Sequence, residues 1–248
     1  YLSPAMIGAE RLFGLLTSNG TRDEFELVEE IGSHPSIIAA AAYSNGIYAL
    51  IAEYQGATEL LDVSSFLRKL EGIEAAELHP VIAPRGDAMD LSKLHLRIIK
   101  FLLEDPRMSI VEIAKKSGLT ARRVRKLLDQ LENSGAIRFR ALIELGAASS
   151  IPFIAKITWD EKQSTYLPIL EWIEKTYPLI HWESYASASE PVLYSLLSAE
   201  NLTEVTALTR ELRNHPPIKG VVTIIGKYHK FFPRYRQNKL REMIESID

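Results

Sequence analysis

The stretch 117-SGLTARRVRKLLDQL-131 decides how the middle of this chain folds. Gly118 can take the left-handed backbone conformation that ends a helix, and the hydroxyl of Thr120 can cap the helix that follows. Apolar residues then recur with a period close to 3.6, which predicts an amphipathic helix over residues 121–133. The side of this helix that faces a domain core is made of Val124, Leu127, Leu128 and Leu131.

The basic residues of the same stretch occupy the other sides of the predicted helix. At about 100° per residue, Arg122 and Lys126 point almost directly away from the apolar side. Arg123 and Arg125 lie on the two flanks. This arrangement suits a DNA major groove, where two long donors reach base edges and the flanking cations contact phosphates. An ordinary solvated helix surface is the alternative.

The residues around this helix complete a helix-turn-helix pattern. The segment 91–105 has apolar residues on one face, and Pro106 ends it. Ser109 and Glu112 have the spacing of a capping box at the start of a second helix. With a wing-like strand after residue 135, the pattern predicts a winged helix-turn-helix DNA-binding domain over residues 87–147. The residues expected to contact DNA are Ser109, Thr120, Arg122, Arg123, Arg125, Lys126, Arg138 and Arg140.

The net charge of the chain is −3, but the charge is distributed unevenly. Residues 1–86 contain 5 Lys and Arg against 12 Asp and Glu, whereas residues 87–140 contain 12 against 7. Residues 141–248 contain 12 against 13. A basic segment inside an acidic chain indicates an anionic partner. The chain contains no cysteine, which excludes disulfides, thiolate metal sites and cysteine nucleophiles.

The segments on both sides of the basic domain share one order of elements. Residues 1–86 read as strand, helix, strand, strand, helix and strand, and residues 148–248 repeat this order before a polar, basic C-terminal helix. The β-α-β-β-α-β order is that of a ferredoxin-like unit. We therefore expect an α+β protein in which two ferredoxin-like domains, 1–86 and 148–248, flank the winged helix-turn-helix domain.

The two flanking segments are also similar in sequence. TELLDVSSFLRKLEGI, from Thr58, matches TEVTALTRELRNHPPI, from Thr203, at an offset of 145 residues. YALIA, from Tyr48, matches YSLLS, from Tyr194, and the N-terminal YLSPAMIGAERLF matches FRALIELGAASSI, from Phe139. Because the second copy of that last segment follows the basic domain, we expect a helical domain of about 50–60 residues upstream in a parent chain. A simple leader strand is the alternative.

The sequence of the basic domain resembles the DNA-binding domain of the Lrp/AsnC (feast/famine) family of transcriptional regulators. The resemblance rests on GLTARRV at 118–124, which fits the family's G-L-[ST]-x-x-x-V turn, and on SGAI at 134–137. The flanking units resemble the ligand-sensing RAM domain of that family. The resemblance implies an amino-acid-responsive regulator whose RAM-type sheets pair into a homodimer or a higher homo-oligomer. Two such units in one chain imply a tandem fusion that mimics a dimer.

The resemblance also implies an effector site between the second and third strands of each unit. The family pattern there is close to G-x-[YF]-D, and the matching positions are 44–47 and 190–193. Ile47 and Leu193 replace the acidic residue, which leaves the ammonium group of an amino acid without its usual partner. The residues expected to contact an amino acid or another small-molecule effector are Ser44, Asn45, Gly46, Tyr48 and Tyr194.

No constellation of catalytic residues stands out in the sequence. The six histidines show no H-x-x-x-H or H-E-x-x-H spacing, and the phosphate-binding glycine motifs and G-x-S-x-G do not occur. Some decarboxylases of modified tetrapyrroles resemble this architecture, but they need convergent His, Arg and Tyr groups, and the sequence shows no convincing cluster. We therefore predict that the chain is not an enzyme and uses no metal or cofactor.

The C-terminal segment YHKFFPRYRQNKLR, residues 228–241, mixes aromatic and basic residues. Such a composition can bind nucleic acid, and it also suits a surface helix or an oligomer contact. The longest apolar runs are too short to cross a bilayer. The sequence thus predicts a cytoplasmic, sequence-specific transcriptional regulator that binds double-stranded DNA and no membrane. An enzyme on the same architecture and an assembly or sensor protein without DNA binding are the alternatives.

Overall fold

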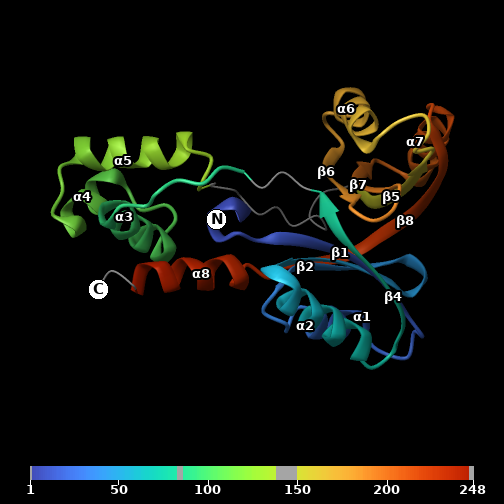
Figure 1. The fold of residues 1–248 in the computed structure, drawn as a ribbon, viewed down its shortest axis with the longest axis horizontal. Helices are drawn as coiled ribbons and strands as arrows, with labels where there is room; N and C mark the ends of the chain where they lie inside the picture. The colour runs from blue at the N-terminus through green and yellow to red at the C-terminus, as the bar shows by residue number, and fades with distance from the viewer. Residues whose placement is uncertain (1, 83–85, 138–149, 246–248) are drawn as a thin grey trace. The chain divides into compact units, whose positions relative to one another are not determined.

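A computed structural model of the chain describes residues 2–82, 86–137 and 150–245. The chain divides into two compact units, and Figure 1 shows their helices and strands. Each unit combines segments that are far apart in the sequence, and together they make the α+β protein that was predicted. None of the described helices is long and apolar enough to cross a membrane. Unit 1 consists of Tyr1–Ala9, Pro84–Ala141 and Pro233–Asp248, and unit 2 of Glu10–Ala83 and Leu142–Phe232.

Unit 2 contains both sequence repeats, and each has the predicted β-α-β-β-α-β order. The 3-10 turn η2 (Ser44–Gly46) joins the second and third strands of the first repeat. The first repeat consists of β1 (Glu10–Ser18), α1 (Glu24–Ile31), β2 (Ile37–Tyr43), β3 (Ile47–Tyr54), α2 (Gly56–Lys69) and β4 (Ile73–Ile82). The second consists of β5 (Ile151–Trp159), α6 (Tyr166–Thr176), β6 (His181–Ser187), β7 (Val192–Ala199), α7 (Leu202–Asn214) and β8 (Ile218–Phe231).

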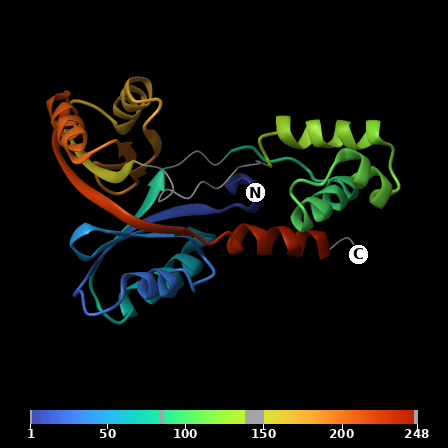
Figure 2. The same cartoon turned by 180° about the vertical axis from the view of Figure 1, so that it is seen from behind.

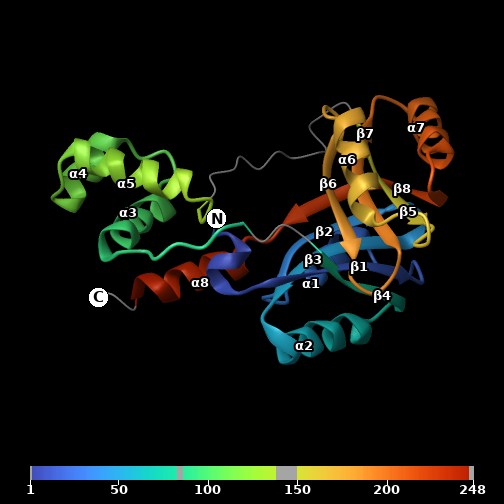
Figure 3. The ribbon, with the colours of Figure 1, turned by 45° about the horizontal axis from the view of Figure 1, so that its top comes forward.

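The strands of the two repeats close into one antiparallel barrel. Its order is β1-β3-β2-β8-β5-β7-β6-β4, so the repeats meet at two places, which we call the β2–β8 seam and the β4–β6 seam. Figure 3 shows the strands of both repeats, with α2 outside one half and α7 outside the other. Every strand of the described barrel has a neighbour on both sides. The two repeats therefore pair with each other within one chain.

Strand β8 links the two halves because it changes partner along its length. Its residues up to Ile225 pair with β5, and its residues from Gly226 onward pair with β2. A Cβ atom at Gly226 would lie 2.9 Å from Cγ and 3.0 Å from the carbonyl oxygen of Pro152. The close approach of these two strands therefore requires glycine at the point of exchange.

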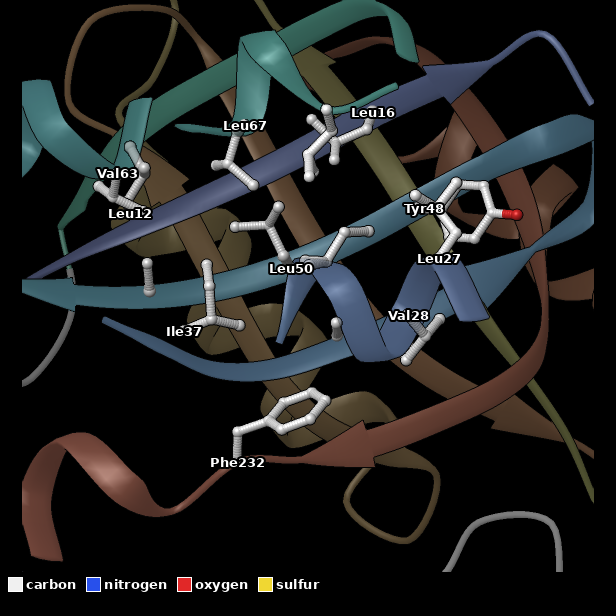
Figure 4. Close-up of a cluster of buried hydrophobic side chains, with 14 of the residues drawn as sticks. Leu12, Leu16, Leu27, Val28, Ile37, Tyr48, Leu50, Val63, Leu67 and Phe232 are labelled. Carbon is white, nitrogen blue, oxygen red and sulfur yellow. The ribbon is translucent and has the colours of Figure 1, made fainter. Parts of the chain in front are cut away.

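Apolar residues alternate along the strands and form separate cores on the two faces of the barrel. The outer core of the first repeat packs α1 and α2 against the sheet, as Figure 4 shows for Leu27 and Leu67 around Leu50. The second repeat has an equivalent outer core under α6 and α7. The inner core lies between the two halves and includes Phe13, Tyr185, Tyr194, Ile154 and Ile224.

Unit 1 is built around three helices, with an additional helix from the end of the chain. The core of the three-helix part contains Ile98, Ile113, Val124 and Leu127. The C-terminal helix α8 lies along α3 in Figures 1 and 2, and the two helices are in contact. The elements are η1 (Pro4–Ile7), α3 (Lys93–Glu104), α4 (Ile110–Ser117), α5 (Ala121–Asn133) and α8 (Arg234–Glu245).

Candidate functional site

Helix α5 forms over the residues that the sequence predicts, and it is fixed at its start and on one face. The hydroxyl of Thr120 accepts a hydrogen bond from the backbone N–H of Arg123 at 3.3 Å, which confirms the predicted N-cap. Val124 and Leu127 are buried against α3 and α4. The packing of this face sets the rotation of α5 about its axis, and it therefore decides which side chains point outward.

Four basic side chains lie on the outer surface of α5, and all of them are exposed: Arg122, Arg123, Arg125 and Lys126. None of them has an ion-pair or hydrogen-bond partner for its side chain among residues 2–82, 86–137 and 150–245. Cations without an intramolecular partner are available to the phosphates and bases of a nucleic acid.

The turn before α5 also has the predicted geometry. Gly118 has a φ of 70°, in the left-handed region, and ends α4. At the start of α4 the hydroxyl of Ser109 donates to the carboxylate of Glu112 at 2.7 Å and accepts from its backbone N–H at 3.2 Å. The first of these hydrogen bonds lowers the pKa of Glu112. Ser109 thus has a structural role as a cap, and its contact with DNA stays a prediction.

The beginning of the predicted wing is paired with the N-terminal segment of the chain. Ile137 forms an isolated antiparallel bridge with Leu2, and the N–H of Ser3 donates to the carbonyl oxygen of Ala136 at 2.7 Å. Arg138 and Arg140, which were expected to contact DNA, lie outside the described residues.

The residues expected to bind an effector are not brought together on one surface. Ser44, Asn45 and Gly46 form η2, in which Asn45 and Gly46 have φ values of 60° and 66°. Tyr48 is part of the outer core of the first repeat, whereas Tyr194 is part of the inner core. The contact of these five residues with an effector stays a prediction.

The structure corrects the sequence match of YALIA with YSLLS by one residue. The ladder pairs Leu15 with Ala49 in the first repeat and Lys156 with Tyr194 in the second. Since Leu15 and Lys156 are equivalent in the two ladders, Tyr194 corresponds to Ala49 and not to Tyr48. A slip of one residue moves a side chain to the opposite face of a strand, so Tyr48 and Tyr194 point to different cores.

A polar cluster that the sequence analysis missed lies next to Tyr194. Glu77 Oε1 accepts hydrogen bonds from Lys156 Nζ and from the Tyr194 hydroxyl, both at 2.5 Å, and His79 Nε2 lies 3.0 Å away. Burial alone would raise the pKa of Glu77, but the hydrogen bonds from Lys156, Tyr194 and His79 together lower it to about 2. The carboxylate is therefore held in its charged form.

A second set of polar contacts continues the cluster along the seam. Arg11 Nη1 lies 3.0 Å from Glu183 Oε1, and Arg11 Nε lies 3.4 Å from Glu53, whose side chain is fully buried. The Tyr185 hydroxyl donates to Glu183 at 2.7 Å, and the rings of Tyr185 and Tyr194 both stack on Phe13. We call the whole set the polar seam: Arg11, Glu53, Glu77, His79, Lys156, Glu183, Tyr185, Ser187 and Tyr194.

The two units differ strongly in charge. Unit 1 contains 17 Lys and Arg against 10 Asp and Glu, a net charge of +7, whereas unit 2 contains 12 against 22, a net charge of −10. A surface that binds a polyanion is therefore expected in unit 1.

The sequence of the three-helix part of unit 1 matches a known family of domains. Residues 91–138 match a family described as winged helix-turn-helix DNA-binding. The protein therefore contains a DNA-binding domain of the winged helix-turn-helix class, as predicted. No protein of curated function matches the sequence.

Solved structures extend the comparison to the whole chain. Two structures of the siroheme decarboxylase NirDL are similar to this protein over 100% of its chain. The structure in co-complex with an iron-uroporphyrin III analogue has a TM-score of 0.61 at 12% identity, and the similarity covers 83% of the NirDL chain. The other has a TM-score of 0.58 at 14% identity, with 82% covered. The structure of B. subtilis LrpC is similar over 55% of this chain and 94% of its own, at 26% identity and a TM-score of 0.42.

These comparisons correct the prediction that the chain is not an enzyme, because the fold over its whole length is also that of siroheme decarboxylase. The prediction rested on the lack of a cluster of His, Arg and Tyr residues, and the polar seam is such a cluster. Its members come from β1, β3, β4, β5, β6 and β7, and they meet only when the barrel closes. No local pattern in the sequence places them together.

Proposed function

We propose that the protein is a sequence-specific transcriptional regulator that binds double-stranded DNA through helix α5. The observation that carries the proposal is the set of four exposed basic side chains on a capped, well-packed helix within the matched winged helix-turn-helix segment. In proteins of this class the recognition helix enters the major groove.

In this proposal the two central cations of α5 read bases and the flanking ones contact the backbone. Arg122 and Lys126 project from the side of α5 opposite Val124, so they reach the floor of the groove. The fork of an arginine side chain matches O6 and N7 of guanine. Arg123 and Arg125 lie nearer the groove walls, where each neutralises a phosphate. Thr120, Ser109, Arg138 and Arg140 would add contacts beside the helix.

Unit 2 supports the proposal through its charge and its closed barrel. Its net charge of −10 repels DNA, which confines the contacts to unit 1. Its two paired repeats supply, inside one chain, the arrangement that a regulator of the resembled family makes between chains. Any effector, whether an amino acid or another small molecule, would act on this unit, and any further oligomer would form through a surface other than the strand edges.

The test is a salt-dependent gel shift on DNA fragments selected from a genomic library. Each base contact contributes about 1–3 kcal/mol of discrimination against the wrong base. We therefore expect the double variant Arg122→Ala with Lys126→Ala to bind the selected sequence and an unrelated sequence with affinities that differ by about 2–6 kcal/mol less than in the wild type. The matched control removes two exposed cations from unit 2, Arg68→Ala with Lys69→Ala, and should leave binding unchanged. Equal affinity and equal sequence preference in both double variants would refute the groove assignment.

A second candidate function is the removal of a carboxylate from a tetrapyrrole. It is favoured by the whole-chain similarity to siroheme decarboxylase and by the polar seam, in which Lys156, Tyr194 and His79 surround Glu77. Decarboxylation releases CO₂ and puts a proton in its place, and Lys156 or Tyr194 could donate that proton. The experiment is incubation with siroheme, the substrate for which the similar enzyme is named, with CO₂ release and absorbance recorded. An unchanged spectrum and no CO₂ at micromolar protein would exclude this candidate.

A further inference from the structure

One carboxylate lies among the basic side chains on the outer surface of α5. Asp129 is exposed, and it follows Arg122 by seven residues and Lys126 by three. At about 100° per residue, these three side chains fall within about 60° of one another. The opposite side of the helix is the buried one, which contains Val124 and Leu131. Arg122, Lys126 and Asp129 thus form one outward stripe of α5, which we call the outer stripe.

Asp129 has none of the structural roles that usually explain a carboxylate on a helix. It is not in the first turn of α5, where the helix dipole would favour it, and Thr120 already caps that end. Its spacing from Arg125 and Lys126 suits ion pairs. Within residues 2–82, 86–137 and 150–245, however, its side chain has no ion-pair or hydrogen-bond partner. Asp129 therefore contributes little to the stability of the helix.

The same carboxylate opposes the general attraction between α5 and DNA. A helix in the major groove lies between two rows of phosphates, and a carboxylate repels them. The negative group is favourable there only where it accepts a hydrogen bond from the DNA. The donors that the major groove offers are N4–H₂ of cytosine and N6–H₂ of adenine. Adenine also places the acceptor N7 beside its amino group, so cytosine suits a carboxylate better.

The length of the outer stripe lets its two ends contact different base pairs. An α-helix rises about 1.5 Å per residue, so seven residues span about 10 Å, or about three base pairs at 3.4 Å each. Recognition helices of homeodomains contact DNA with residues at positions i, i+3, i+4 and i+7. The spacing from Arg122 to Asp129 is the same as from the first to the last of these positions. Asp129 can therefore reach a base edge while Arg122 contacts another base in the same groove.

We propose that Asp129 is a specificity-determining residue that selects cytosine by accepting a hydrogen bond from its N4 amino group. The inference rests on the proposed binding of DNA through α5, and it adds the base that one position of the operator must carry. Asp129 rejects guanine and thymine at that position, because both present oxygen acceptors to the groove. The operator should contain this cytosine about three base pairs from the guanine that Arg122 contacts.

The experiment selects duplexes from a fully randomised library with the full chain and its variants. Asp129→Asn removes the charge and keeps the shape, and the matched control is Glu132→Gln, because Glu132 is an exposed carboxylate on the flank of the same helix. We expect the wild type to recover sites with one fixed cytosine. Asp129→Asn should accept adenine there, because an amide pairs with N6 and N7 of adenine. The preference for cytosine should fall by about 5- to 100-fold, the effect of one mismatched contact, whereas Glu132→Gln should recover the wild-type site.

A further variant, Asp129→Glu, keeps the carboxylate and should retain the preference for cytosine, since both acidic side chains accept from N4. Circular dichroism checks that each variant is folded. If Asp129→Asn does not fold, Asp129→Ala takes its place and should lose the preference for cytosine without gaining one for adenine.

Two results would overturn the inference and leave DNA binding by α5 in place. One is recovery of the same site by the wild type and Asp129→Asn. The other is an equal gain in affinity for all sequences in Asp129→Asn and Glu132→Gln, which would mean that both carboxylates act through charge alone. If the wild type recovers no site, or if Arg122→Ala with Lys126→Ala recovers the wild-type site, the proposed function fails and the inference fails with it.

Discussion

The stability of the barrel depends on pH through Glu77, because the neighbours of this carboxylate lower its pKa. Its pKa lies at about 2 in the folded protein, against an ordinary value of 4.5. A group with a lowered folded pKa contributes stability that is complete above its unfolded pKa and is lost as the pH falls toward the folded one. The stability contributed by Glu77 is therefore present above about pH 5 and is lost between about pH 5 and pH 2.

The size of this contribution is limited by solvent. Lowering the pKa of Glu77 from 4.5 to about 2 corresponds to about 3.4 kcal/mol of folding free energy if no charge is screened. The side chain of Glu77 is 38% exposed, and screening reduces ion-pair energies at such positions, so we expect about 1–2 kcal/mol. Glu77→Gln should therefore lower the free energy of unfolding by about this amount at pH 7 and by much less near pH 2.

The assay is urea denaturation of the wild type and of two variants at several pH values. The matched control is Glu74→Gln, because Glu74 is an exposed carboxylate on the same strand. We expect the control to follow the wild type, whereas the pH dependence of Glu77→Gln should be flatter between pH 5 and pH 2. Identical curves for both variants would show that the polar seam does not hold the repeats together through Glu77.

Four further outcomes follow from other parts of the structure. Gly226→Ala should lower the free energy of unfolding by about 1–3 kcal/mol, measured by urea denaturation, because its Cβ would meet Pro152; no loss would mean that β5 and β8 can separate there. Thr120→Ala should cost unit 1 about 1 kcal/mol through the lost cap, visible as weaker hydrogen-exchange protection at the start of α5. Arg123→Ala or Arg125→Ala should each reduce the log–log slope of DNA affinity against salt by about 0.9, whereas an unchanged slope would remove that residue from the backbone contacts. Leu127→Ala should lower the free energy of unfolding of unit 1 by about 2–4 kcal/mol, because it leaves a cavity in the core. DNA binding, followed as the temperature rises, should be lost at the temperature at which unit 1 unfolds.

The sequence predicts α5 well because the signals that define it are local. Thr120, Gly118 and the spacing of Val124 and Leu127 all lie within one stretch, and each acts on its immediate neighbours. The direction of Arg122 then follows from helix geometry alone. The same holds for the order of elements in both repeats, since strand and helix periodicity is read within a few residues.

The polar seam is not predictable in this way because it depends on register between distant strands. Glu77 and Tyr194 are 117 positions apart, and they meet only because β4, β5 and β7 each have one particular alignment in the barrel. An error of one residue in matching the repeats moves Tyr194 to the wrong face, as the pairing of YALIA with YSLLS shows. A polar residue at an inward position of a strand, such as Lys156 in IPFIAKITW, is the one local sign of the cluster.

The contacts of the polar seam also bear on which function unit 2 can have. Arg11–Glu183, Lys156–Glu77 and Tyr194–Glu77 each join the first repeat to the second. These pairs form only when unlike repeats face each other, so they favour pairing within the chain over pairing of like repeats between chains. A catalytic role needs Lys156 or Tyr194 to release its hydrogen bond to Glu77 when a substrate binds, whereas a purely structural role requires that bond to persist. Lys156→Met separates the two roles: a loss of stability without any change in tetrapyrrole binding assigns the polar seam to repeat pairing.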